Sequence, residues 1–172
     1  TAITNIGACG APESISLSGP GFGWNILACG FFTGGDEQIY SFTPTVTGTY
    51  SLTVTSATGG FIDYFWVDAV SGCGSGAPWT CIQDIISPGT YGSMAWTAGQ
   101  TYYILLDAES SFGPDNQTFI LNCPGGGGGG GINASDCDVA VNVCTNLTFA
   151  IDPSGFGLIN ELCPSGTCAA NP

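Results

Sequence analysis

The sequence contains no lysine, no arginine and no histidine, although it has 172 residues and 13 aspartate and glutamate residues. A globular chain of this length normally carries roughly 20 basic residues. Ser-His-Asp and Cys-His catalysis need a histidine base, and Schiff-base chemistry needs a lysine, so these classes of enzyme are excluded. Nucleic acids are excluded as partners because phosphate binding depends on lysine and arginine.

Long apolar runs are also missing, since no stretch approaches the ~20 apolar residues of a membrane-spanning helix. We therefore expect no membrane insertion. Charged residues make up only 8% of the chain and hydrophobic residues 44%, whereas disordered acidic chains combine high net charge with low hydrophobicity. The composition predicts a folded protein.

Helical periodicity is absent, and apolar residues instead alternate with a period of two. In residues 48–55, Tyr50, Leu52 and Val54 point one way and the hydroxyl-bearing residues the other. Similar runs cover residues 38–43, 61–69, 101–107 and 117–122. Short strands separated by turn-forming residues predict an all-β fold, an antiparallel β-sandwich of jelly-roll type with disulfide staples.

A run of seven glycines at residues 125–131 divides the chain. Such a run cannot pack a core, so it predicts a flexible linker between a β-sandwich domain at residues 1–124 and a C-terminal segment at residues 132–172.

The C-terminal segment repeats features of the first domain. The Gly-Phe-Gly sequence at 21–23 begins eight residues before Cys29, and the same sequence at 155–157 begins eight residues before Cys163. The segment is too short to bury a sandwich core alone. Either it is a partial second repeat of a chain that continues, or it is a docking or strand-donor tail that pairs with a neighbouring copy.

Several motifs together resemble a known family. They are, in chain order, Cys9, Cys29, residues 34–43, residues 48–52, Cys73, Cys81, residues 98–107 and residues 118–123. Residues 9–123 resemble the bacterial pre-peptidase C-terminal type of β-sandwich, as found in tandem copies in large secreted surface proteins of Bacteroidota. Residues 136–162 are similar to a segment associated with gliding motility and type IX secretion in the same proteins. The resemblance implies an extracellular, non-catalytic module of an adhesin or surface filament.

Carboxylates are the remaining chemical groups. A glycosidase needs two of them, and Asp107 and Glu109 would share one face of an extended segment. Calcium takes six to eight oxygen ligands and would supply the positive charge that the chain lacks. The candidate calcium ligands cluster around one turn, with one more on a strand that the resemblance places nearby: Asp107, Glu109, Asp115, Asn116 and Asp63. No other cofactor is expected.

Nine cysteines indicate an oxidising compartment, and hence a secreted, extracellular or cell-surface protein. The first predicted disulfide joins Cys73 and Cys81, which bracket a short Gly/Pro loop. Two further pairs are predicted in the C-terminal segment: Cys163 with Cys168, and Cys137 with Cys144. Three cysteines remain unassigned, and three thiols cannot all pair among themselves: Cys9, Cys29 and Cys123.

Trp79 lies inside the same Gly/Pro loop, and we expect it to be exposed as a sugar-stacking residue. The function predicted from the sequence is a non-catalytic structural or adhesive module, as a repeat of a cell-surface protein or a subunit of a surface filament. The alternative is a carbohydrate-binding module of a secreted enzyme. The predicted partners are copies of the same chain, neighbouring repeats or surface glycans.

Overall fold

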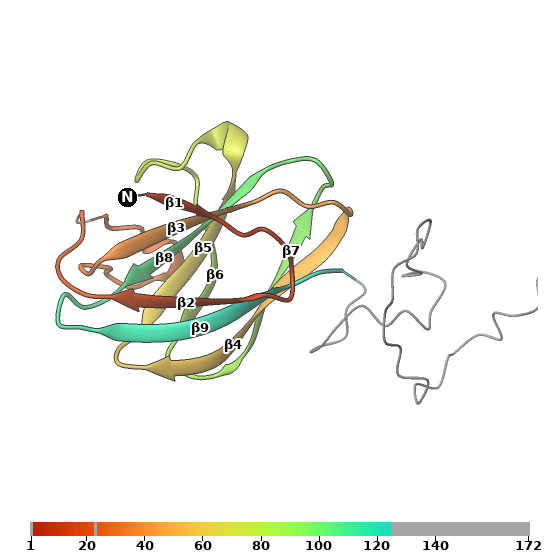
Figure 1. Cartoon of the computed structure of the whole chain (residues 1–172). Coiled ribbons are helices and arrows are strands. Elements are labelled where there is room, and N and C mark those ends of the chain that lie inside the picture. The colour runs from red at the N-terminus through yellow and green to blue at the C-terminus, as the bar shows by residue number, and fades with distance from the viewer. Residues whose placement is uncertain (1, 23, 125–172) are drawn as a thin grey trace, which may run out of the picture. The chain divides into compact units, whose positions relative to one another are not determined.

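The computed structural model describes residues 2–22 and 24–124. They form two β-sheets packed face to face (Figure 1). One sheet has five strands in the order β1-β3-β8-β5-β6, and the other has four in the order β2-β9-β4-β7. The strand bounds are β1 Ile3–Asn5, β2 Pro12–Leu17, β3 Glu37–Phe42, β4 Gly48–Thr58, β5 Ile62–Asp68, β6 Thr80–Ile85, β7 Gly89–Trp96, β8 Tyr102–Ala108 and β9 Asp115–Asn122.

The predicted all-β sandwich is confirmed, and the five runs read from alternation correspond to β3, β4, β5, β8 and β9. Strand pairing is antiparallel except between β1 and β3, which run parallel. Two short 3₁₀ helices, η1 (Leu27–Cys29) and η2 (Ala69–Ser71), lie in loops. No helix within the described residues is long and apolar enough to cross a membrane.

The main core fills the space between the sheets with aromatic and aliphatic side chains. Tyr50, Leu52 and Val54 are buried in it, as their alternation predicted. Trp96 stacks on Tyr102 with ring centroids 4.8 Å apart and on Tyr50 at 5.2 Å. Offset and tilted aromatic contacts of this kind add to the stabilisation from area burial.

A second, smaller core lies on the outer face of the five-stranded sheet. Phe65 and Leu105, on neighbouring strands, pack there with Ile26, which comes from the loop that carries η1. The loop is attached to the sheet by a disulfide between Cys29 and Cys81 of β6. Residues 24–29 of this loop therefore cover part of a face that would otherwise be exposed to water.

The disulfides differ from those predicted. Cys81 pairs with Cys29 and not with Cys73, so the predicted Cys73–Cys81 bond is wrong. Cys81 lies on a strand whose outer face meets η1, which brings it to Cys29. The loop that begins at Cys73 is closed instead by a hydrogen bond from the Trp79 indole to the Gly74 carbonyl oxygen (2.9 Å).

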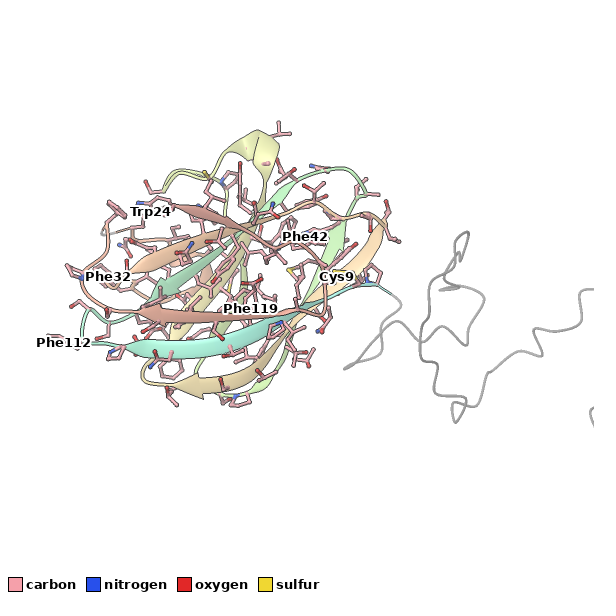
Figure 2. The ribbon with its side chains drawn as sticks, in the orientation of Figure 1. Cys9, Trp24, Phe32, Phe42, Phe112 and Phe119 are labelled. Atoms are coloured by element: carbon pink, nitrogen blue, oxygen red, sulfur yellow. A yellow bond between two sulfur atoms is a disulfide. The ribbon has the colours of Figure 1, made fainter. Side chains whose placement is uncertain are left out.

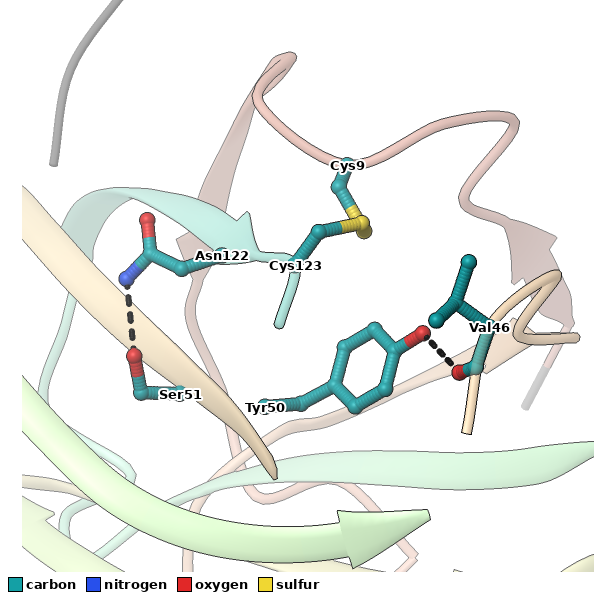
Figure 3. Close-up of a disulfide and its surroundings, with 6 residues drawn as sticks. All are labelled: Cys9, Val46, Tyr50, Ser51, Asn122 and Cys123. Carbon is teal, nitrogen blue, oxygen red and sulfur yellow. Dashed lines mark hydrogen bonds between the residues drawn. A yellow bond between two sulfur atoms is a disulfide. The ribbon is translucent and has the colours of Figure 1, made fainter. Parts of the chain in front are cut away.

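The other disulfide joins Cys9 and Cys123, two of the cysteines left unassigned (Figure 3). Pro12 pairs with Ile120 between β2 and β9, and continuing this antiparallel register outward brings Cys9 opposite Cys123. Next to the bond, the Tyr50 hydroxyl donates to the Val46 carbonyl oxygen (2.7 Å). The bond therefore closes the N-terminal and C-terminal ends of the domain onto each other.

The two disulfides close chain segments of 114 and 52 residues. In the chain-entropy model, loops of this size contribute about 4 to 5 kcal/mol each. Cys73 has no disulfide partner among the described residues and packs, half-buried, against the second core. The predicted bonds Cys137–Cys144 and Cys163–Cys168, the linker and the C-terminal segment all lie outside the described residues.

Candidate functional site

Four carboxylates form a row across the outer face of the five-stranded sheet. Glu37 of β3 is paired with Asp107 of β8, Asp107 with Asp63 of β5, and Asp63 with Asp84 of β6. Directly paired residues in an antiparallel sheet project from the same face. The side chains on this face are therefore neighbours although 70 residues separate Glu37 from Asp107 in sequence. We call these four residues the acidic row.

Glu37 is the member of the acidic row whose carboxylate receives hydrogen bonds from the protein's own backbone. Its carboxylate accepts hydrogen bonds from the backbone N–H groups of Phe22 (2.8 and 3.1 Å) and Trp24 (3.1 Å). A Cβ at Gly21, which has φ +55°, would collide with Glu37 and with the Gly35 carbonyl oxygen. Glycine at 21 thus lets the loop approach Glu37 closely, which explains part of the repeated Gly-Phe-Gly motif.

Asp107 is fully buried, and neither of its carboxyl oxygens has a hydrogen-bond partner among the described residues. Burial raises its pKa to about 8, and the charges of Glu37, Asp63 and Asp36 add to the rise. The nearby Thr33 hydroxyl lowers the pKa, but it gives its proton to the Trp24 carbonyl oxygen (3.1 Å). Within residues 2–22 and 24–124, no donor is therefore committed to Asp107.

Asp63, Asp84 and Glu109 form a tighter group at one end of the row. Each has a carboxyl oxygen within 4.8 Å of those of the other two. Asp63 is fully buried with both oxygens unpartnered, and Asp84 and Glu109 are half-buried with one unpartnered oxygen each. We call these three residues the carboxylate group.

The carboxylate group has perturbed proton affinities. Burial raises the pKa of Asp63 to about 7, with further contributions from the charges of Asp84 and Glu109. Burial also raises the pKa of Asp84 and that of Glu109, the latter with help from the charge of Asp84. A carboxylate buried without a partner favours its neutral form or a bound cation.

The candidate calcium ligands predicted from the sequence are only partly brought together. Asp63 and Glu109 belong to the carboxylate group, and Asp107 lies beside Asp63 in the acidic row. Asp115 is instead bonded to the backbone N–H of Gly60, at the start of a strand in the other sheet. Asn116 is exposed and donates to the Pro114 carbonyl oxygen (3.4 Å).

Sequence reasoning missed Asp84 and Glu37. Asp84 lies on β6, a strand that the alternation pattern did not reveal because its burial is irregular. Had residues 80–85 been paired with β5, Asp84 would have been found opposite Asp63. Glu37 directly precedes the first predicted strand. Pairing that strand with the strand of Asp107 would have identified Glu37 as a neighbour of Asp107.

The expected exposure of Trp79 is wrong. Its side chain is only 6% exposed and packs in the second core, where its indole N–H is satisfied by the Gly74 carbonyl oxygen. A Gly/Pro loop folded over an apolar face buries its aromatic residue, and the sequence pattern does not distinguish this from a loop that projects into water. Trp79 therefore presents no stacking surface to a sugar.

Exposed phenylalanines gather instead at one end of the sandwich, on two loops. The loops lie side by side, because Gly34 N–H donates to the Glu109 carbonyl oxygen (3.3 Å) and Gly35 N–H to that of Ala108 (2.9 Å). Figure 2 shows Phe32 and Phe112 at this end, whereas Phe42 and Phe119 lie between the sheets. We call the exposed residues the phenylalanine end: Phe22, Phe31, Phe32 and Phe112.

No family model matches the chain, and no curated protein matches it. Among solved structures, it is similar to the pre-peptidase C-terminal domain of collagenase from Bacillus anthracis. The sequence identity is 12%, the match covers 70% of this chain and 95% of that chain, and the TM-score is 0.49. It is also similar to PliG of Aeromonas hydrophila, a periplasmic inhibitor of g-type lysozyme. There the identity is 18%, the coverage is 70% of this chain and 97% of that chain, and the TM-score is 0.39.

The first of these structures bears the name of the family that the sequence resembles. Neither comparison bears on Bacteroidota or on type IX secretion. At these TM-scores neither similarity supports an argument about function, so the proposals below rest on the residues of this chain.

Proposed function

We propose that this domain is a non-catalytic extracellular module that joins neighbouring copies of itself through the phenylalanine end, in a cell-surface protein or a surface filament. The observation that carries the proposal is the exposure of four phenylalanines on two adjacent loops. Phe112 is 92% exposed. Contiguous exposed apolar surface is uncommon on a monomeric protein and marks interaction sites.

A second copy is the occupant that the chain itself supports. The Gly-Phe-Gly motif, which presents Phe22, recurs at residues 155–157, so a neighbouring repeat would carry an equivalent phenylalanine. Copies of this chain all have negative charge and no basic side chain, so no salt bridge between their side chains can form. Apolar contact supplies an attraction between copies that needs no opposite charge.

The non-catalytic part of the proposal rests on the absent bases and on burial. The sequence has no histidine or lysine, and Asp63 and Asp107 are 0% exposed. A glycosidase needs one carboxyl group at the leaving oxygen and another at the sugar ring or its attacking water. A sugar cannot reach carboxylates that water does not reach, so Asp107 does not fit the role of a glycosidase residue.

Extracellular location is supported by the two disulfides, since such bonds persist in oxidising compartments. The resemblance to tandem modules in Bacteroidota surface proteins supports the adhesive and repeat parts of the proposal. Trp79, the residue on which the carbohydrate-binding alternative was based, is buried. That alternative now has no identified contact residue.

The proposal is tested by self-association of the full chain. The double variant Phe32→Ser/Phe112→Ser removes half of the phenylalanine end, and Val70→Ser is the matched control. Val70 is 90% exposed and lies in η2, which adjoins the start of β8, whereas Phe112 follows its end. Analytical ultracentrifugation from micromolar to millimolar concentration measures the association.

We expect the wild type and Val70→Ser to associate with increasing concentration and the double variant to remain monomeric. A wild type that is monomeric throughout the range would contradict the proposal, as would a control variant that loses association equally. Binding of the monomer to a glycan array, lost in the double variant, would favour the carbohydrate-binding alternative.

A further inference from the structure

We propose that the carboxylate group of Asp63, Asp84 and Glu109 binds one calcium ion, with Asp107 beside it in the acidic row. The proposal does not depend on self-association. Three carboxyl groups from β5, β6 and the residue after β8 converge although they are far apart in sequence. Convergence alone is common among acidic residues, so the argument rests on what surrounds them.

The second observation is the burial of unpartnered oxygens. Asp63 and Asp107 are 0% exposed, and none of their four carboxyl oxygens has a hydrogen-bond partner in the part of the chain that the structure describes. Asp84 and Glu109, whose carboxyl groups lie within 4.8 Å of that of Asp63, each have one further buried oxygen without a partner among the described residues. An ionised carboxylate buried without a partner is costly, whereas a bound metal ion satisfies several oxygens at once.

The chain cannot provide the missing positive charge from its own side chains. It has no lysine, arginine or histidine, so no side-chain ion pair can form with these carboxylates. Glu37, by contrast, is satisfied by the amides of Phe22 and Trp24. Backbone N–H groups thus donate to Glu37 at one end of the acidic row. At the other end, Asp63 and Asp84 would be neutralised by a cation from solution.

The ligand chemistry identifies the class of ion. The group offers only carboxylate oxygens, which favour hard cations such as Ca²⁺ and Mg²⁺ over zinc or copper. Calcium binds oxygen at 2.3–2.6 Å, so oxygens on opposite sides of the ion are about 4.6–5.2 Å apart. Oxygens within 4.8 Å of one another can therefore share one calcium ion. The smaller Mg²⁺ demands near-ideal octahedral geometry and releases its water reluctantly.

The ion would also tie the phenylalanine end to the sheet. Glu109 begins the loop that carries Phe112, and its backbone N–H donates to the Phe61 carbonyl oxygen (3.2 Å) just before β5. A bridge from Glu109 to Asp63 and Asp84 would link this loop to β5 and β6.

The test is calorimetric titration of the full chain with CaCl₂ after treatment with EDTA, together with thermal unfolding in Ca²⁺, Mg²⁺ and EDTA. Asp84→Asn and Glu109→Gln remove one ligand charge each while keeping the side-chain shape. Glu13→Gln is the matched control, because Glu13 is half-buried on β2 of the other sheet.

We expect one Ca²⁺ per chain and a higher unfolding midpoint in Ca²⁺ than in EDTA. Asp84→Asn and Glu109→Gln are expected to weaken binding by at least about tenfold, and Glu13→Gln to leave it unchanged. Without metal, Asp84→Asn should unfold at or above the wild-type midpoint, because it removes an unpartnered negative charge. Lost binding in this variant would then not be caused by unfolding.

Three results would overturn the proposal. The first is a wild type that shows neither heat of binding nor a changed midpoint with Ca²⁺. The second is Ca²⁺ binding that Asp84→Asn and Glu109→Gln leave unaltered, which would place the ion elsewhere in the chain. The third is a midpoint shift with Mg²⁺ that equals or exceeds the shift with Ca²⁺, which would exclude calcium as the preferred ion.

Discussion

The two faces of the five-stranded sheet bury their polar groups differently. On the inner face, the Tyr64 hydroxyl donates to Gln117 (2.9 Å), and the Gln117 amide donates to the Ile85 carbonyl oxygen (2.9 Å). Two buried atoms of the opposite, four-stranded sheet lack a partner among the described residues: the Trp96 indole N–H and one carboxyl oxygen of Asp115. On the outer face, Asp63 and Asp107 are equally buried, and no described residue donates a hydrogen bond to their carboxyl oxygens.

This difference means that the same strands contribute to the stability of the domain through one face and offer a candidate ion-binding site on the other. Residues of even number on β5 and β8 build the main core, and residues of odd number build the second core and the acidic row. Protein atoms alone satisfy almost all of the inner face. The outer face combines a covered apolar region with two buried carboxyl groups, Asp63 and Asp107, that no described residue partners. The stability of this face should therefore depend on pH and on dissolved cations.

The largest effect is expected from a substitution in the main core, where Trp96 of β7 packs against the inner face of the five-stranded sheet. Trp96→Ala removes a fully buried ring that stacks on Tyr50 and Tyr102, and it should lower the free energy of unfolding by about 3–5 kcal/mol. Urea denaturation followed by far-UV circular dichroism measures this loss. The calcium affinity of the folded variant should stay at the wild-type value. A loss below about 1 kcal/mol would show that this face does not carry the stability of the domain.

Removing the disulfide over the outer face should have a similar or slightly smaller effect. Cys29→Ser/Cys81→Ser opens a loop of 52 residues, and the chain-entropy model predicts a loss of about 4 kcal/mol. Cys73→Ser is the control, because Cys73 forms no disulfide with any of residues 2–22 and 24–124. Urea midpoints of the two variants provide the comparison. If the control lost as much stability as the double variant, the assigned pairing would be wrong.

The smallest effect is the pH dependence of the metal-free protein. The pKa values of Asp63 and Asp107 rise in the folded state from 3.8 to about 7 and about 8. Between the unfolded and the folded pKa values, the folded state therefore binds more protons than the unfolded state. The free energy of unfolding consequently falls as the pH rises from about 4 to about 8. The fall should be roughly 2 to 4 kcal/mol, because the groups are coupled and only part of each shift is realised.

Urea denaturation in EDTA at pH 5 and pH 8.5 measures this difference. Asp63→Asn should flatten the dependence, whereas Glu13→Gln should leave it as in the wild type. A metal-free protein that is more stable at pH 8.5 than at pH 5 would mean that these carboxylates are not unpartnered in the folded state.

Much of the fold could be predicted from local alternation. Tyr50, Leu52 and Val54 are recognisable as a buried stripe because strand side chains alternate between two faces. Strands β1, β2, β6 and β7, which are the edge strands of the two sheets, were missed. An edge strand such as β6 buries its residues irregularly and has no clear alternation. The missed strand β6 carries both Asp84 and Cys81, so one omission affected the predicted ion ligands and the predicted disulfide.

The candidate site was predictable only in part. Asp107 and Glu109 were found because the chain lacks cations and these acids cluster around one turn, and Asp63 was added because the resemblance places its strand nearby. Asp115 was included because it is near Glu109 in sequence, but it begins β9 in the other sheet. Proximity along a turn does not decide which face or sheet a side chain joins, and strand pairing does.

Composition and alternation suffice to establish an all-β chain without basic side chains, in which histidine- and lysine-dependent chemistry is impossible. These properties are local or additive, so they can be read without knowing which strands are neighbours. Register across distant strands decides which carboxylates meet, which cysteines bond and whether Trp79 is exposed. Pairing β5 with both β6 and β8 places Asp63 between Asp84 and Asp107, and no local pattern in the sequence contains that arrangement.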